Sequence, residues 1–349
     1  MNYQGTVFGD LLVPYFELHE NLENPYTQDD VVCRPSFWKD GASEKVFEIP
    51  DLEVRKLKDR LVEQKKEDAK LNKRVFFDGS LVRLKEYSLN DEIHKLYLEL
   101  QRTSFFTFSA TNKSLDNPEV RRMINERGAS YTNLDDGLAN PIGVNIVLIS
   151  KPDNAIILTK RSGKLSQYPE LYGIPAGFMS AEKDRKYFKE QDAPVTGSEF
   201  GPITYTEKFV YNPFLTAKRE VTEEAANNIT IDSIKMMGNG KAVDDRHNEF
   251  QMIAETPSTV EKILSAPKSS KWETEKLFGV PFNPKNAMEY LTKTIKEEPK
   301  GVPKGTGAWV PGKSPEWVPA HWKAVHSALI QKFGFDEVWN AYEETRRNH

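Results

Sequence analysis

Apolar and polar residues alternate along the chain in patterns that predict both strands and helices. Residues 143–150 (GVNIVLIS) and 155–161 (AIILTKR) flank a Lys-Pro-Asp-Asn turn, which predicts a central β-hairpin. Asn212 and Pro213 are typical of an N-cap and a first helical position, so a helix is expected to run to about residue 227. The same reasoning predicts an amphipathic helix over 51–73, strands over 229–237 and 249–255, and a helix over about 319–332.

The remaining segments show less periodicity. Residues 1–50 contain many prolines and aromatic residues and are expected to form an irregular arm. Asp78-Gly79, between the apolar runs 75–77 and 81–84, is a hairpin signal. A loop rich in Pro, Gly and Lys covers 299–315.

Composition narrows the class of protein. The 349 residues are 38% hydrophobic, which is enough for a folded core, and the formal net charge of -4 disfavours a nucleic-acid binder. Cys33 is the single cysteine, so neither a disulfide nor a structural zinc site is expected. The sequence has no long apolar run and no signal peptide, so we expect a cytoplasmic protein that neither enters a membrane nor is exported.

Three glutamates on the predicted helix suggest a chemical role. Glu220, Glu223 and Glu224 are spaced i, i+3 and i+4, so their carboxylates share one helix face and repel one another. Magnesium would relieve this repulsion, because it prefers oxygen ligands and often bridges carboxylates to substrate phosphates. The opposite face is apolar and is expected to pack on a sheet, through Phe214, Ala217, Val221 and Ala225.

The segment around these glutamates resembles the Nudix hydrolase family. Residues 219–224 (REVTEE) match the R-E-U-x-E-E core of the Nudix box, and Pro175-Ala176-Gly177 stands where the family has a P-G-G-like turn. The resemblance implies an α+β fold, a Nudix α/β/α sandwich with a mixed sheet, plus a smaller N-terminal α/β domain. It also implies metal ligation by Glu220, Glu223, Glu224 and the carbonyl of Ala176, with Arg219 organising the turn.

The match departs from the family pattern in two places. About 35 residues, 178–212, separate the Gly turn from the helix, so the upstream glutamate of the box is not assigned, and Glu182 and Glu207 are both candidates. The closing G-U pair of the box, a glycine followed by an apolar residue, is replaced by Ala226-Asn227.

Weaker motifs resemble the uridine-diphosphate-glucose pyrophosphatase branch of the family. They occur in order at 75–84, 106–112 and 138–144, and that branch also has an added N-terminal domain and a long insertion before the catalytic helix. The implied domains are an arm over 1–50, a substrate-capping domain over 51–135, a Nudix domain over 136–295 and a C-terminal region over 296–349.

Other residues are candidates for substrate contacts or proton transfer. Phe106, Phe108 and Asn112 have the chemical types that would stack on uracil and hydrogen-bond to it, or else they are core residues. Glu249 is a further ligand or base, or else part of a surface salt bridge, and His247 is expected at the surface. The four C-terminal tryptophans, Trp309, Trp317, Trp322 and Trp339, are expected to pack within the chain or in a possible homodimer.

The expected activity is hydrolysis of UDP-glucose to UMP and glucose 1-phosphate, with Mg²⁺ or Mn²⁺ as cofactor. Water would attack one phosphorus in line while a glutamate of the helix removes its proton. Alternative substrates are ADP-ribose, a dinucleotide or a capped RNA end. A different class of function is a Nudix-fold sensor that binds a nucleotide without cleaving it, and the three glutamates argue against this.

Overall fold

The computed structural model divides into two compact units, each made of segments that are separate in sequence. The structure describes residues 5–35, 45–72, 78–165, 167–187, 209–267, 274–300, 302 and 307–348. Unit 1 comprises Met1–Gln28, Gly143–Gly177 and Ala217–His349. Unit 2 comprises Asp29–Ile142 and Phe178–Thr216.

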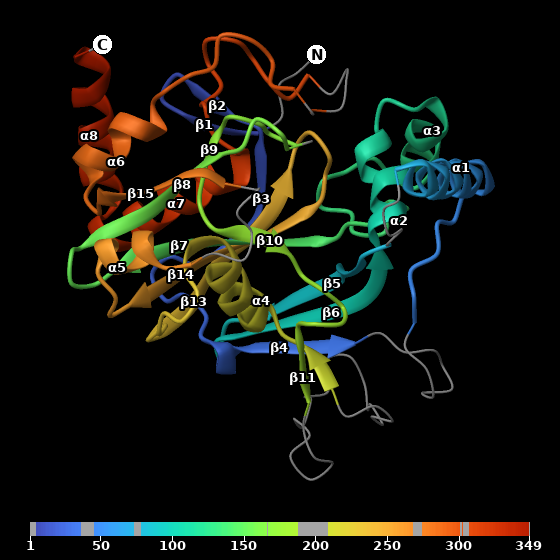
Figure 1. Cartoon of the computed structure of the whole chain (residues 1–349), viewed down its shortest axis with the longest axis horizontal. Helices are drawn as coiled ribbons and strands as arrows, with labels where there is room; N and C mark the ends of the chain where they lie inside the picture. Colours follow the sequence, from blue (N-terminus) through green and yellow to red (C-terminus); the bar gives the residue numbers. More distant parts are fainter. Residues whose placement is uncertain are drawn as a thin grey trace. The chain divides into compact units, whose positions relative to one another are not determined.

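Unit 1 is organised around one large sheet (Figure 1). Its described strands run in the order β15-β8-β7-β14-β13-β3, with β10 paired to β7 and β9 paired to β8. Their bounds are β3 Tyr15–Glu20, β7 Ile142–Ser150, β8 Ala155–Arg161, β9 Tyr172–Gly173, β10 Ala176–Phe178, β13 Ser233–Ala242, β14 Asn248–Thr256 and β15 Thr274–Pro281. A short antiparallel pair, β1 Thr6–Phe8 and β2 Leu11–Val13, precedes β3.

The central hairpin predicted from sequence is confirmed. Strands β7 and β8 are antiparallel, with Ile149 opposite Ile156 and Ser150 opposite Ala155. Every residue of β7 is buried, as expected of a central strand whose two faces are both covered. Strands β13 and β14 correspond to the strands expected over 229–237 and 249–255, and they pair as a second antiparallel hairpin.

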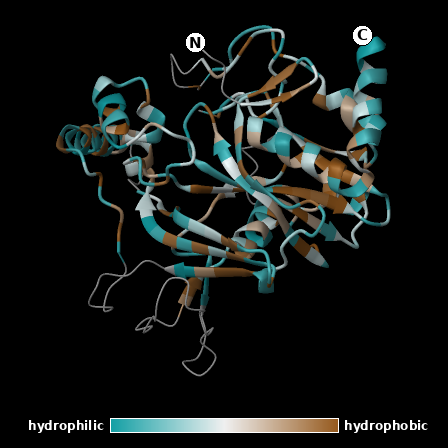
Figure 2. Cartoon of the chain, turned by 180° about the vertical axis from the view of Figure 1, so that it is seen from behind, coloured by the Kyte–Doolittle hydropathy of each residue, from teal (hydrophilic) through white to brown (hydrophobic). Residues whose placement is uncertain are grey.

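Helices cover this sheet and complete the core of unit 1. They are α5 Val260–Ser265, α6 Pro284–Leu291, α7 Pro319–Phe333 and α8 Phe335–Arg347. Helix α7 packs on β13 and β14, and its Trp322 ring is fully buried. Figure 2 shows brown, apolar residues concentrated on the strands and helices of this region. Trp309 and Trp317 are also buried, so three of the four C-terminal tryptophans are packing residues.

One expectation about the N-terminal arm is wrong. Residues 15–20 form the regular strand β3, which pairs antiparallel with β13 at the edge of the sheet. The partner strand lies more than 200 residues further along the chain, so this pairing has no local signal in the sequence. Tyr15 is buried there, and its hydroxyl accepts a hydrogen bond from Gln251 at 2.9 Å.

Unit 2 combines a small mixed sheet with helices. Strand β6 (Lys95–Ser104) pairs in parallel with β4 (Val31–Pro35) and antiparallel with β5 (Ser80–Asn90). Its other elements are α1 Leu52–Leu71, α2 Phe105–Ala110, η2 Asn112–Ser114, α3 Pro118–Glu126, β11 Arg185–Tyr187 and β12 Phe209–Tyr211. A short 3-10 turn, η1 Gln28–Asp30, leads into β4.

The amphipathic helix predicted over 51–73 is α1. Asp51 caps it by accepting hydrogen bonds from the backbone N–H groups of Glu53 and Val54. Val54 is buried, whereas the charged residues of the helix face solvent. Residues 75–77, one arm of the hairpin expected around Asp78-Gly79, lie outside the described residues.

Both units contain helices and sheets, so the chain has the α+β class that the sequence predicts. The units divide the chain differently from the expected domains, because residues 178–216 group with the N-terminal segment and residues 1–28 group with the C-terminal part. None of the described helices has the length and apolar character needed to span a bilayer.

Candidate functional site

The glutamate-bearing helix is α4 (Pro213–Glu220), and it begins as the sequence predicts. The Asn212 side chain caps it by accepting a hydrogen bond from the Phe214 N–H at 2.9 Å, and Pro213 occupies the first turn. The four residues of the predicted apolar stripe, Phe214, Ala217, Val221 and Ala225, are all buried. Burial of this stripe fixes the rotation of the helix, and with it the direction of the opposite face.

The last turn of the helix widens into a π turn, η5 (Val221–Ala225). The Ala226 N–H bonds to the carbonyl of Val221 at 3.0 Å, which is a separation of five residues instead of four. This turn contains Glu223 and Glu224, so the simple i, i+3, i+4 spacing read from the sequence does not describe their directions. Single π turns in helices are frequent at functional sites.

Two of the three glutamates lie against the Gly turn of β10. Oε2 of Glu224 accepts a hydrogen bond from the Ala176 N–H at 3.1 Å. The Glu220 carboxylate lies directly over Gly177, where a Cβ atom would collide with it. Gly177 is therefore required here because it leaves room for a carboxylate. Gly177 of the turn and Glu220 of the helix motif are 43 positions apart in the sequence, and they lie together in unit 1.

Arg219 connects the other two carboxylates. Its Nη1 atom lies 2.5 Å from Oε1 of Glu220 and 3.3 Å from Oε2 of Glu223. Glu220 is buried, whereas 29% of the Glu223 side chain is exposed. The contacts described for Arg219 are with two glutamates of its own helix, and its expected role in organising the Gly turn stays a prediction.

These residues fit a hard cation in their chemistry but do not form a complete cage. Glu220 and Glu224 offer buried carboxylate oxygens at one backbone turn, which is the donor type that magnesium and manganese prefer. Over the described part of the chain, however, no three His, Cys, Asp or Glu side chains are grouped closely enough to hold a metal ion. Ala176 contributes its N–H to the described contacts, where the resemblance implied its carbonyl.

Glu249 belongs to a separate buried cluster on the β13–β14 hairpin. Its Oε1 lies 2.5 Å from Nε2 of His247, and its Oε2 accepts a hydrogen bond from Asn145 at 2.9 Å. Nδ1 of His247 bonds in turn to Asp245. Both His247 and Glu249 are buried, so neither the expected surface histidine nor a surface salt bridge is present. Asp245 lies in the turn that precedes β14, and Arg246 has φ of +60°, so the contact of His247 with both Asp245 and Glu249 depends on the turn and has no periodic signal in the sequence.

The loop before β9 adds two residues that the sequence did not indicate. The Tyr168 hydroxyl donates to Asp244, and Gln167 Nε2 donates to Asp245 at 3.1 Å. Burial by itself would lower the pKa of His247, but Asp245 and Glu249 raise it well above its ordinary value. Burial, and then the neighbouring Asp245, raises the pKa of Asp244 to about 7. His247 therefore lies inside the fold between two carboxylates that favour its charged form.

The strand register separates this cluster from the helix glutamates. The backbone bonds from Ile146 N to Pro175 O and from Met179 N to Ile142 O make β7 and β10 antiparallel, with Val144 opposite Gly177. Opposite residues point to the same face, so Gly143, the neighbour of Val144, points to the other. The Glu220 carboxylate lies over Gly177 and that of Glu249 over Gly143. Glu249 is thus on the face away from Glu220, and the structure does not join it to the predicted site.

The predicted uracil contacts lie inside unit 2. Phe108 and Asn112 are fully buried, and Phe106 is nearly so. Asn112 Nδ2 donates to Asn140 Oδ1 at 3.3 Å, and Phe108 packs with Leu81 and other apolar residues. Their surroundings favour the packing interpretation of these three residues over contact with a nucleobase.

The structure does not assign the upstream glutamate of the box to Glu182 or to Glu207. Glu182 is exposed and forms an ion pair with Arg102 at 3.6 Å, both within unit 2. Glu207 lies outside the described residues.

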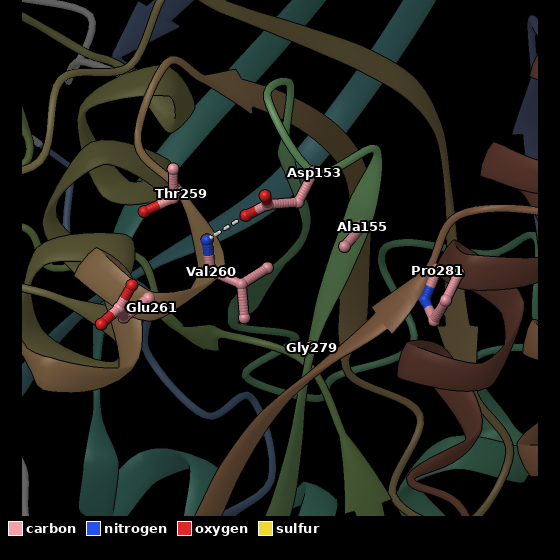
Figure 3. A pocket seen from close by; sticks show the side chains of 7 residues that line it. All are labelled: Asp153, Ala155, Thr259, Val260, Glu261, Gly279 and Pro281. Carbon is pink, nitrogen blue, oxygen red and sulfur yellow. Dashed lines mark hydrogen bonds between the residues drawn. The ribbon is translucent and has the colours of Figure 1, made fainter.

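A hollow of about 420 Å³ at one edge of the unit 1 sheet contains none of the predicted site residues (Figure 3). Asp153 points toward its α5 side and accepts a hydrogen bond from the Val260 N–H at 2.5 Å. Pro281 lies on the far side in this view, and Gly279 also lines the hollow, where it packs closely against Val260. The acidic group is thus already used to hold the start of α5.

Comparison with known proteins gives little beyond these observations. No family model and no curated protein matches the chain. The chain is similar to two solved structures of a bifunctional NMN adenylyltransferase/ADP ribose pyrophosphatase from Francisella tularensis, one of which is complexed with AMP and a Mn ion. Each match covers 48% of this chain at 15% sequence identity, with a TM-score of 0.24. The similarity covers 43% and 42% of those chains, which is less than half of their length. A likeness this weak supports neither a fold nor an activity.

Proposed function

We propose that this protein is a Nudix-type hydrolase that cleaves the pyrophosphate linkage of a nucleoside diphosphate derivative. The observation that supports it best is the placement of two motif carboxylates, Glu220 and Glu224, against the Gly177 turn. A helix face that only met solvent would have no need to bury two carboxylates at a backbone turn, because burying charge is costly. Within this class, we propose UDP-glucose as the substrate and UMP and glucose 1-phosphate as the products, on the order of motifs in the sequence.

Glu220 and Glu224 would hold a divalent cation, with Glu223 completing the set. When bound, magnesium or manganese supplies neutralisation of the negative charge on the pyrophosphate oxygens. The Ala176 N–H orients Glu224 through its hydrogen bond, and Arg219 keeps Glu220 and Glu223 close together. These contacts hold the carboxylates in place before the substrate arrives, and such preorganisation is a large source of rate acceleration.

The reaction needs water, a base and a leaving phosphate. An oxygen of water attacks one phosphorus in line, the bond from that phosphorus to the bridging oxygen breaks, and the bridging oxygen leaves on the other phosphate. Glu223 is partly exposed, so it is the glutamate of the three that is most accessible as acceptor of the water proton.

Charge-removing variants test the proposal. Glu220→Gln and Glu224→Gln keep the side-chain shape, so each is expected to fold normally and to lose at least about 100-fold in kcat. Glu337→Gln, at an exposed glutamate at the start of α8, is the matched control and should retain full activity. Products are measured by chromatography after incubation with UDP-glucose and magnesium, and ¹⁸O water identifies the phosphorus that is attacked. Near-normal turnover in both site variants would overturn the assignment.

A further inference from the structure

Unit 2 contains a cavity of about 860 Å³ that the proposed hydrolase site does not use. Strands β5 and β6 and the segments 45–50 and 127–135 line it, and all of them belong to unit 2. Its volume lies within the range of about 300–1,000 Å³ that is typical of small-molecule sites. The cavity is therefore large enough for a metabolite of ordinary size.

A buried arginine lines this cavity. Arg83, on β5, is only 2% exposed. Its Nη1 donates to Oε1 of Gln101 at 3.2 Å, and its Nη2 donates to the carbonyl of Leu134 at 2.8 Å. The guanidinium carbon lies 4.1 Å from the centre of the Phe47 ring. These contacts fix the plane of the guanidinium group, which is how arginine is prepared to recognise a planar oxyanion.

Among the described residues, no carboxylate forms an ion pair with Arg83. Both hydrogen-bond acceptors are neutral, and among the described residues its Nε has no hydrogen-bond partner. Burial lowers the pKa of Arg83 to about 10, although Asp136 and Asp135 act in the opposite direction. Burying a charge without a paired counter-ion is costly, so such an arginine favours the binding of an anion.

The strand itself is irregular where it meets the cavity. The register of β5 against β6 shifts between Leu84 and Glu86, which leaves Lys85 as the extra residue of a β-bulge. Lys85, Glu86 and Tyr87 consequently all line the cavity, although residues of a regular strand would alternate between faces. Bulges often turn side chains toward binding sites.

Two other cations of the lining lie close to carboxylates, and the lining also includes Lys45, Glu48 and Glu86. Lys85 is paired with Glu99 at 2.6 Å, and Arg127 lies 3.9 Å from Asp135. Arg83 is therefore the cation of the lining that best fits a single acidic group. Phe47 and Tyr87 add aromatic surface beside it.

We propose that this cavity binds a small metabolite bearing one carboxylate or phosphate group, and that Arg83 receives that group. The site goes beyond the proposed hydrolase function, because its lining contains no residue of the glutamate helix.

Calorimetric titration of the full-length protein tests the proposal with two probes, inorganic phosphate and the monocarboxylate butyrate, at constant ionic strength. Metal is first removed on a chelating resin, so that phosphate cannot bind through a cation at the glutamates. Saturable binding of one probe identifies the acidic group as phosphate or carboxylate. Arg83→Gln should weaken that binding at least about tenfold, whereas Arg121→Gln, at an exposed arginine of α3, should leave it unchanged.

A second variant keeps the test decisive if Arg83→Gln fails to fold. Thr132 is exposed at the cavity, and Thr132→Trp would fill space there without disturbing a core residue. Loss of binding in Thr132→Trp supports the proposal. Wild-type binding by a folded Arg83→Gln variant would overturn it, as would wild-type binding by Thr132→Trp or the absence of binding by both probes up to about 10 mM. Because these titrations need neither metal nor turnover, their failure is distinct from failure of the hydrolase proposal.

Discussion

Replacing Gly177 with alanine is expected to remove most activity and to leave the fold intact. The new Cβ atom would lie 2.5 Å from Oε2 of Glu220, whereas ordinary contact begins at 3.4 Å. The Glu220 carboxylate must therefore move by about 1 Å, away from the turn. A misplacement of about 1 Å in a catalytic arrangement can cost about 100-fold, so kcat is expected to fall by that factor.

The assay measures kcat with UDP-glucose and magnesium, and circular dichroism with thermal melting checks the fold. Gly163→Ala is the matched control, because its Cβ would lie 3.1 Å from the Oε1 atom of Glu170. A small movement of the Glu170 side chain would relieve this contact. The control should keep wild-type kcat. A folded Gly177→Ala variant with wild-type kcat would refute the idea that the position of Glu220 against the turn matters.

Two further predictions concern stability. Trp322→Ala should lower the free energy of unfolding, measured by urea denaturation, by about 3–5 kcal/mol. The reason is that the ring is fully buried and its Nε1 donates a hydrogen bond to the carbonyl of Leu291. A loss no larger than that of Trp339→Ala, at a partly buried tryptophan, would contradict this. Burial raises the pKa of Asp244 from 3.8 to about 7, so the folded state keeps a proton that the unfolded state releases. Its contribution to stability therefore falls as pH rises between those values, and Asp244→Asn should reduce this fall in Tm scans from pH 4 to 8, whereas an unchanged slope would contradict the prediction.

Local signals explain which parts of the fold were predictable. The capped start of α4 at Asn212-Pro213 and the β7–β8 hairpin depend on neighbouring residues, so one sequence was enough to locate them. Strand β3 was missed because its partner β13 is distant in sequence. The helix α8 was not predicted either, although Gly334, with φ at +84°, marks the break between it and α7.

The sequence allowed the residues of the candidate site to be predicted better than their spatial arrangement. Sequence identified Glu220 and Glu224 and the turn at Gly177, and the structure places them together in unit 1. The π turn changes the directions of the glutamates, and its hydrogen bond depends on tertiary packing that a helical wheel does not include. The sheet face of Glu249 follows from the register of β7 and β10, which a single sequence does not contain.

Metal-dependent hydrolysis of a nucleoside diphosphate derivative is tested most directly by product analysis. The full-length protein is incubated with magnesium and a panel of nucleoside diphosphate derivatives. The panel includes UDP-glucose, ADP-ribose, a dinucleotide and a capped RNA end, each with and without excess chelator. Hydrolysis of another member in place of UDP-glucose would change the substrate and leave the reaction class intact. We expect UDP-glucose to yield UMP and glucose 1-phosphate with magnesium, and we expect the chelator to stop the reaction. Hydrolysis at full rate in excess chelator, or no hydrolysis of any member by the metal-loaded protein, would contradict it.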